Sequence, residues 1–269
     1  YDNNRITIEG STDLAFSEDV GARFLAYGWH VQHVRDGNDI DALKTALSNA
    51  KLASDKPTLV IVDTHIAWGS PNKQDSCESH GAPLGEEEIR ATKAVYGWDP
   101  DKHFHVPKET AAFTEGCISR GASSEKEWNE RFEAYRTEFP DLALQFEMIQ
   151  KKILPKGWDA AIPTFPSDSK GMATRDAGGK ILNAVAPAIP WLMGGSADLG
   201  SSTKTVISKA TSFSKESRDG RNFHFGIREH AMGAIANGMA LSGLRPYGST
   251  FLIFQDYMRP AVRLSALMK

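Results

Sequence analysis

The feature that most constrains the fold is a continuous apolar run that follows a helical pattern. Pro57 introduces Thr58–Asp63, in which four aliphatic residues follow one another without polar alternation. Such a run is typical of a strand that is covered on both faces, as in a parallel sheet. Residues 40–52 place apolar side chains three and four positions apart, and residues 29–34 alternate like a strand. A strand, a helix and a second strand in this order predict a βαβ unit and an α/β fold.

The same alternation extends over the rest of the chain. Helical spacing is found in six further segments: residues 18–27, 86–96, 107–153 with breaks near Gly121 and Pro140, 172–186, 229–243 and 257–268. Three further strands are expected, at residues 191–193, 223–225 and 246–252. Ser17 is the expected N-cap of the first helix, because Glu18 and Asp19 follow it. Residues 66–84 and 194–203 are rich in Gly and Ser and are predicted to be loops.

This pattern predicts two α/β domains with parallel sheets. The first occupies residues 1–105 and the second residues 172–269. Residues 106–171 between them form a helical segment and an extended, proline-containing linker. The chain begins at Tyr1 without a methionine and ends inside a helical pattern. We therefore expect a piece of a longer polypeptide, with both domains incomplete.

Composition excludes several classes of function. A net charge of −3 offers no electrostatic footprint for nucleic acid or for an anionic membrane surface. Cys77 and Cys117 are the only cysteines and form no Cys-x-x-Cys motif, which indicates a reduced, intracellular setting. The longest aliphatic run, Leu59–Val62, is too short to cross a bilayer, and no signal peptide is found. We expect a cytoplasmic or organellar protein without nucleic-acid or membrane partners.

Residues that could supply oxygen ligands for a cation follow the end of the first predicted strand. Asn3 and Asn4 precede Arg5-Ile6-Thr7-Ile8. A side-chain amide oxygen and a backbone carbonyl two residues later can face one hard cation, such as Mg²⁺ or Ca²⁺. The simpler interpretation is an Asx turn.

Two basic residues are candidate phosphate contacts. His80 closes the long loop, where Gly81 permits close backbone approach, and Arg175 follows Ala173-Thr174 at the start of a predicted helix. Histidine and arginine both donate hydrogen bonds to phosphates. A surface histidine and a solvated arginine are the simpler alternatives.

A carboxylate and three aromatic residues lie close together in the second predicted domain. Glu229 opens a helix, and Phe251, Phe254 and Tyr257 follow the next strand. One acid beside an aromatic wall suits a flat heteroaromatic ring that requires protonation. Taken singly, Glu229 is more often a helix-start acid favoured by the helix dipole, and such aromatic residues are more often part of the core.

Asp198 is also expected at the ligand-binding edge of the second predicted sheet. It follows Gly194-Gly195-Ser196-Ala197 after a predicted strand, and α/β proteins bind ligands at the carboxyl ends of their strands. The alternative is that Asp198 caps a helix.

In this order, from Tyr1 to Lys269, these motifs resemble the transketolase family of thiamine diphosphate enzymes. Six segments carry the resemblance: Tyr1–Gly10, His80–Leu84, Ala173–Arg175, Gly194–Leu199, Gly226–Gly233 and Thr250–Tyr257. The resemblance implies that residues 1–105 belong to the diphosphate-binding domain and residues 172–269 to the pyrimidine-binding domain. It also implies a homodimer or a partner chain, because the family builds its cofactor site between two subunits.

The resemblance assigns roles to individual residues. Asn4 and Ile6 would bind the Mg²⁺ or Ca²⁺ ion through a side chain and a carbonyl, and Ile8 would pack near the thiazolium ring. Asp198 would lie near the same ring, and His80 would touch diphosphate and substrate. Phe251, Phe254 and Tyr257 would form the pocket for the pyrimidine ring. Arg175 and Ser202 would bind the sugar phosphate.

The implied reaction is reversible transfer of a two-carbon ketol unit from a ketose phosphate to an aldose phosphate, as in the pentose phosphate pathway and the Calvin cycle. Glu229 would protonate the pyrimidine ring so that the cofactor forms its nucleophilic ylid. Dihydroxyacetone synthase shares these motifs, and a non-catalytic fragment or a subunit of a split enzyme is a further alternative.

Three features depart from the family pattern. Ala67 replaces a glycine, Gly200-Ser201 replaces the residue and proline that usually precede Ser202, and the Gly-Asp-Gly motif that supplies a metal ligand is missing.

Overall fold

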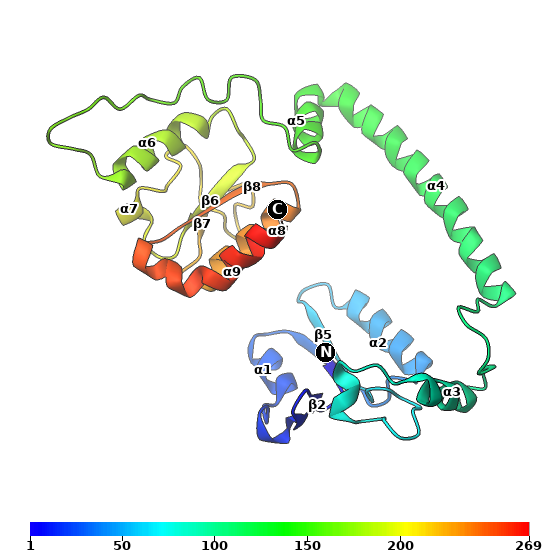
Figure 1. Cartoon of the computed structure of the whole chain (residues 1–269). Coiled ribbons are helices and arrows are strands. Elements are labelled where there is room, and N and C mark those ends of the chain that lie inside the picture. Colours follow the sequence, from blue (N-terminus) through cyan, green and yellow to red (C-terminus); the bar gives the residue numbers. More distant parts are fainter. Residues whose placement is uncertain (269) are drawn as a thin grey trace. The chain divides into compact units, whose positions relative to one another are not determined.

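The computed structural model describes residues 1–268 and divides into two compact units, Tyr1–Thr114 and Glu115–Lys269. Both contain a parallel sheet with helices packed on it (Figure 1), so the predicted α/β class is confirmed. The narrower division into residues 1–105, 106–171 and 172–269 stays a prediction. Among the described residues, no helix combines the length and hydropathy that a membrane span requires.

The sheet of the first unit has the order β1–β5–β4, with all neighbours parallel. The apolar run forms the central strand β5 (Thr58–Asp63), between β1 (Asp2–Asn3) and β4 (His30–Val34). Helices α1 (Val20–Ala26) and α2 (Ile40–Leu52) contact β4, and α3 (Glu86–Val95) follows the long loop. The short elements are β2 (Ile6–Thr7), β3 (Gly10–Ser11), η1 (Thr12–Leu14) and η2 (Cys77–His80).

The predicted N-cap of the first helix is wrong by two residues. Asp19, not Ser17, is the N-cap of α1, and its carboxylate accepts a hydrogen bond from the Ala22 amide at 2.8 Å. An N-cap side chain accepts the amide two or three residues further on, and Asp19 has this spacing because it directly precedes Val20, the first residue of the helix.

One predicted helix break is confirmed and the other is wrong. Helix α4 (Lys108–Glu138) continues through Gly121, whereas α5 (Pro140–Gln150) begins at Pro140, a position where proline needs no amide donor. A glycine inside a helix costs only about 1 kcal/mol relative to alanine, so a long helix tolerates it. Residues 151–173 contain no helix or strand, as the linker prediction requires.

The second unit is built on the sheet β7–β6–β8, also parallel throughout. Its strands are β6 (Leu192–Ser196), β7 (Asn222–His224) and β8 (Arg245–Ser249). Besides α5 and most of α4, its helices are α6 (Thr174–Val185), α7 (Gly200–Thr203), α8 (Glu229–Leu241), η3 (Leu252–Phe254) and α9 (Gln255–Met268). Helices α8 and α9 pack against each other, and α8 contacts β8 (Figure 1).

The central strand of this unit is longer than predicted. Gly194, Gly195 and Ser196 belong to β6 rather than to a loop. A Cβ atom on Gly194 would lie 2.0 Å from the Tyr247 carbonyl oxygen, and one on Gly195 would lie 1.8 Å from the Phe223 carbonyl oxygen. These glycines therefore let the neighbouring strands approach closely, and they do not form a turn.

Candidate functional site

Glu229 is held in a buried position by a helix and a strand end. It is the first residue of α8, and only 7% of its surface is exposed. Thr250, which directly follows β8, donates a hydrogen bond from Oγ1 to Glu229 Oε1 at 3.1 Å. The N-terminus of α8 favours a negative charge at this place. The carboxylate thus has one oxygen fixed by Thr250.

Glu229 lines a pocket of about 660 Å³ whose walls are mainly apolar. The pocket also has Asp198, Phe254 and Tyr257 among its lining residues. The Phe254 ring lies 6.3 Å from the Tyr257 ring and 6.0 Å from the Phe251 ring, and both pairs are nearly parallel. The structure therefore brings four predicted site residues to one pocket, with Phe251 one ring further along. A flat ring that needs a proton at one atom fits such walls.

Asp198 enters this pocket from a strained turn. It is exposed and has a φ of 61°, in the left-handed region that aspartate tolerates better than most residues. Ser196 Oγ accepts the Leu199 amide at 2.6 Å and closes the turn. Leu199, not Asp198, is the N-cap of α7, so the alternative role of Asp198 as a helix cap is wrong.

The predicted metal and diphosphate residues gather in the first unit. Asn4 follows β1, and its Oδ1 accepts the Ile6 amide at 3.0 Å, so the Asx turn is present. An amide oxygen keeps a second lone pair, which leaves Asn4 able to bind a cation. Helix η2, which ends at His80, packs against β2, which begins at Ile6. His80 and Ile8 are exposed, the latter by 74%.

This oxygen set fits a hard cation. Among residues 1–268, no cluster of three or more His, Cys, Asp and Glu side chains is arranged to hold a metal. A site on Asn4 and Ile6 would instead use amide and peptide oxygens, which suit Mg²⁺ and Ca²⁺.

Arg175 and Ser202 lie on two helices that touch each other. Arg175 is the second residue of α6 and Ser202 the third residue of α7, and both are exposed. Neither residue lines the pocket of Glu229. Their predicted contact with sugar phosphate stays a prediction.

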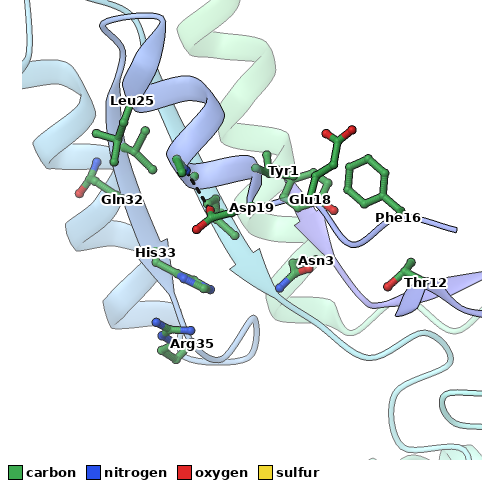
Figure 2. Close-up of a pocket in the computed structure, with 15 residues that line it drawn as sticks. Tyr1, Asn3, Thr12, Phe16, Glu18, Asp19, Leu25, Gln32, His33 and Arg35 are labelled. Atoms are coloured by element: carbon green, nitrogen blue, oxygen red, sulfur yellow. Dashed lines mark hydrogen bonds between the residues drawn. The ribbon is translucent and has the colours of Figure 1, made fainter. Parts of the chain in front are cut away.

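A different pocket, of about 500 Å³, lies in the first unit beside α1 and the sheet (Figure 2). None of the predicted site residues lines it. Its polar side includes Asn3 and His33, which bind Asp63 Oδ1 at 2.7 and 2.8 Å. Burial alone would raise the pKa of Asp63, but these hydrogen bonds and the nearby Arg35 lower it. The cluster lies at the carboxyl ends of β1, β4 and β5.

Sequence reasoning missed Glu88, which binds the long loop. Its Oε1 accepts hydrogen bonds from the Ser70 hydroxyl and from the Asn72 amide at 2.8 Å, and its Oε2 accepts from Asn72 Nδ2 at 2.9 Å. The hydrogen bond from Ser70, followed by those from Asn72, lowers the pKa of Glu88 to about 2. Three consecutive acids in the first turn of α3 look like ordinary dipole partners, so the sequence offered no signal for this one.

The shifted pKa of Glu88 predicts a pH-dependent contribution to stability. Because the pKa of Glu88 is lower in the folded than in the unfolded protein, its carboxylate stabilises the fold at pH values above the unfolded pKa of 4.5. This contribution disappears as the pH falls toward 2. We expect Glu88→Gln to have a lower free energy of unfolding than the parent at pH 6, and the gap to narrow below pH 4.5. Denaturant titrations at several pH values measure the gap. Glu87→Gln, on the same turn, should show none, and a pH-independent gap for Glu88→Gln would refute the explanation.

Comparison with known proteins accounts for nearly the whole chain. Residues 1–155 match the family model for the transketolase thiamine diphosphate binding domain, and residues 170–269 match that for the transketolase pyrimidine binding domain. A transketolase of Halalkalibacterium halodurans is 49% identical over 270 residues, which cover 100% of this chain and 40% of the relative.

Solved structures of transketolases are also similar to this chain. A transketolase from Leishmania mexicana has a TM-score of 0.91 and 41% identity over 98% of this chain and 39% of its own. A Pichia stipitis transketolase in complex with sedoheptulose-7-phosphate has a TM-score of 0.90 and 39% identity over 99% of this chain and 40% of its own. This chain thus spans about two fifths of the length of these relatives. Because the two domain models belong to one family and follow each other along the chain, the chain belongs to the transketolase family.

Proposed function

We propose that the polypeptide containing this chain transfers a two-carbon ketol unit from a ketose phosphate to an aldose phosphate, with thiamine diphosphate and Mg²⁺ or Ca²⁺. The observation that carries the proposal is the burial of Glu229 in an apolar pocket beside Phe254 and Tyr257. A carboxylate is rarely buried without a function or a partner, and here the partner is a single hydroxyl. The placement of the reaction in the pentose phosphate pathway or the Calvin cycle belongs to the same proposal.

Glu229 would act as the acid that holds a proton on a ring nitrogen of the cofactor. Thr250 fixes Oε1, which leaves the other carboxyl oxygen for the ring. Phe254 and Tyr257 would hold the ring flat and keep water away, which strengthens the hydrogen bond to Glu229. When bound, the cofactor supplies the nucleophilic carbon that attacks the ketose carbonyl and carries the two-carbon unit.

The remaining predicted residues would bind the charged parts. Asn4 and Ile6 would contribute two oxygens to the cation, Ile8 would pack near the cofactor, and His80 would donate to diphosphate and substrate. Asp198 would lie near the thiazolium ring, and Arg175 and Ser202 would hold the sugar phosphate.

We further propose that the complete site forms with a second copy of the polypeptide or with a partner chain. The support is the resemblance to a family whose sites lie between subunits. We place the enzyme in the cytoplasm or in an organelle. The support is the cysteine content, since two cysteines without a Cys-x-x-Cys motif are usual in reduced compartments.

The test is an assay of the full gene product with thiamine diphosphate and Mg²⁺. Sedoheptulose 7-phosphate with an aldose phosphate acceptor should yield the five-carbon aldose phosphate that remains when two carbons are removed. A parallel reaction with formaldehyde as acceptor identifies a dihydroxyacetone synthase if formaldehyde is preferred. No transfer to either acceptor, together with no calorimetric signal for cofactor binding, would support the non-catalytic alternative and overturn the proposal.

A further inference from the structure

The loop that leads to His80 has a shape that needs outside support. Two of its non-glycine residues have φ in the left-handed region, Ala67 at 50° and Asp75 at 57°, beside Gly69 at 80°. This conformation explains why the family usually has glycine where this chain has Ala67, since alanine is strained there. Strained positions of this kind persist only where the surroundings hold them. The contacts that hold this loop are therefore informative about function.

Helix α3 and its C-cap hold the loop at two places. Near the start of the loop, the C-cap residue Tyr96 stacks on Trp68 with ring centroids 5.4 Å apart, and its hydroxyl donates to the Trp68 carbonyl oxygen. A Cβ atom on Gly69 would lie 2.4 Å from Tyr96 Cε1, so the two pack without spare space. Further along, Glu88 binds Ser70 and Asn72 with both of its carboxylate oxygens.

Hydrogen bonds continue from the Glu88 contacts to Ser79, the residue before His80. Ser70, only 3% exposed, accepts the Lys73 amide on its Oγ at 3.2 Å. The Lys73 carbonyl oxygen in turn accepts a hydrogen bond from Ser79 Oγ at 2.8 Å. Ser79 directly precedes His80 in η2. Glu88, Ser70, Lys73 and Ser79 thus form an unbroken series of contacts that ends beside His80.

We propose that Glu88 is a positioning residue that fixes His80 for its contact with the substrate. The inference rests on the proposed function, in which His80 touches substrate and diphosphate. Both oxygens of Glu88 are occupied by the loop, so Glu88 acts through the loop and not on the substrate. The hydrogen bonds of Ser70 and Asn72 lower the pKa of this carboxyl group to about 2, so it is charged at neutral pH.

A double-mutant cycle on the full gene product tests the proposal. The four proteins are the parent, Glu88→Ala, His80→Ala and the double variant, assayed with sedoheptulose 7-phosphate as donor. Misplacing a group by about 1 Å can lower the rate by about 100-fold, so we expect Glu88→Ala to lower kcat/KM by about 10- to 100-fold. In the His80→Ala background the same substitution should change kcat/KM by less than about 2-fold, because its target is gone.

Two further variants keep the result interpretable. Glu88→Gln retains one acceptor oxygen and should lose less kcat/KM than Glu88→Ala, and it replaces Glu88→Ala in the cycle if the latter does not fold. Glu87→Gln, which changes a neighbouring exposed acid, should behave like the parent.

The outcomes separate the two proposals. Equal losses from the Glu88 substitution in both backgrounds, or no loss at all in the parent, would overturn the positioning role. A normal kcat/KM for His80→Ala alone would overturn the proposed function of His80, and the positioning role with it. A loss for His80→Ala but none for Glu88→Ala would overturn only the positioning role.

Discussion

Replacing Glu229 with alanine is expected to lower ketol transfer by the full gene product by about 10²- to 10⁴-fold, the usual contribution of a well-placed acid or base. The loss should appear in kcat when thiamine diphosphate is kept in excess. The reason is that Glu229 is a buried carboxylate beside Phe254 and Tyr257, whereas the other acid of this pocket, Asp198, is exposed. Steady-state kinetics at two cofactor concentrations measure the loss.

Three controls isolate the carboxyl group. Glu229→Gln keeps the shape and the bond from Thr250 but cannot donate a carboxyl proton, so it should resemble Glu229→Ala. Thr250→Val removes only the supporting hydroxyl and should cost less. Asp256→Asn removes an exposed carboxylate one residue from Tyr257, on the first turn of α9, and should leave the rate unchanged. Parent-like activity of Glu229→Ala at ordinary cofactor levels would refute the role of Glu229.

Replacing Gly195 with alanine is expected to remove at least about 3 kcal/mol from the free energy of unfolding, at the upper end of overpacking effects. The added Cβ would lie 1.8 Å from the Phe223 carbonyl oxygen, a backbone atom of a paired strand that cannot rotate away. Strands β6 and β7 would have to separate, which breaks their hydrogen bonds. Denaturant unfolding followed by circular dichroism measures the change.

Gly238→Ala is the matched control for this substitution. Gly238 lies in α8, is exposed, and has nothing within 4 Å of the position of its missing Cβ. Alanine there should raise the free energy of unfolding by about 0.5–1 kcal/mol, since glycine is a poor helix former. If Gly195→Ala unfolds at the same denaturant concentration as the parent, β6 does not pair with β7 as closely as described.

Periodicity was sufficient for most of the fold. Helix α2 and strand β5 have the predicted bounds, because a capped amphipathic segment and an apolar run each carry their signal locally. Gly194 and Gly195 misled the prediction because the same residue serves turns and close backbone approach. Whether the glycines form a turn or allow close approach depends on how near Phe223 and Tyr247 lie to β6. That distance cannot be inferred from a local sequence pattern.

The candidate site was likewise predicted only in part from the sequence. Glu229, Phe254 and Tyr257 are near in sequence, and a helix start beside a strand end was enough to predict that they meet. Glu88 was missed because its partners, Ser70 and Asn72, lie across an irregular loop with no period. Loops of this kind are determined by individual hydrogen bonds, which sequence patterns do not report.

The close approach of β6 to its neighbours also limits how the pocket of Glu229 can change. Gly194 and Gly195 let the neighbouring strands approach β6 closely, and Ala197, which directly follows β6, lines the pocket with a single methyl group. A larger residue at Gly194 or Gly195 would force the paired strands apart, so these positions of the sheet cannot vary without loss of the strand pairing. New ligand preferences in this unit would therefore have to arise at the rim, where Asp198, Ile227 and His230 have exposed side chains that substitution can alter.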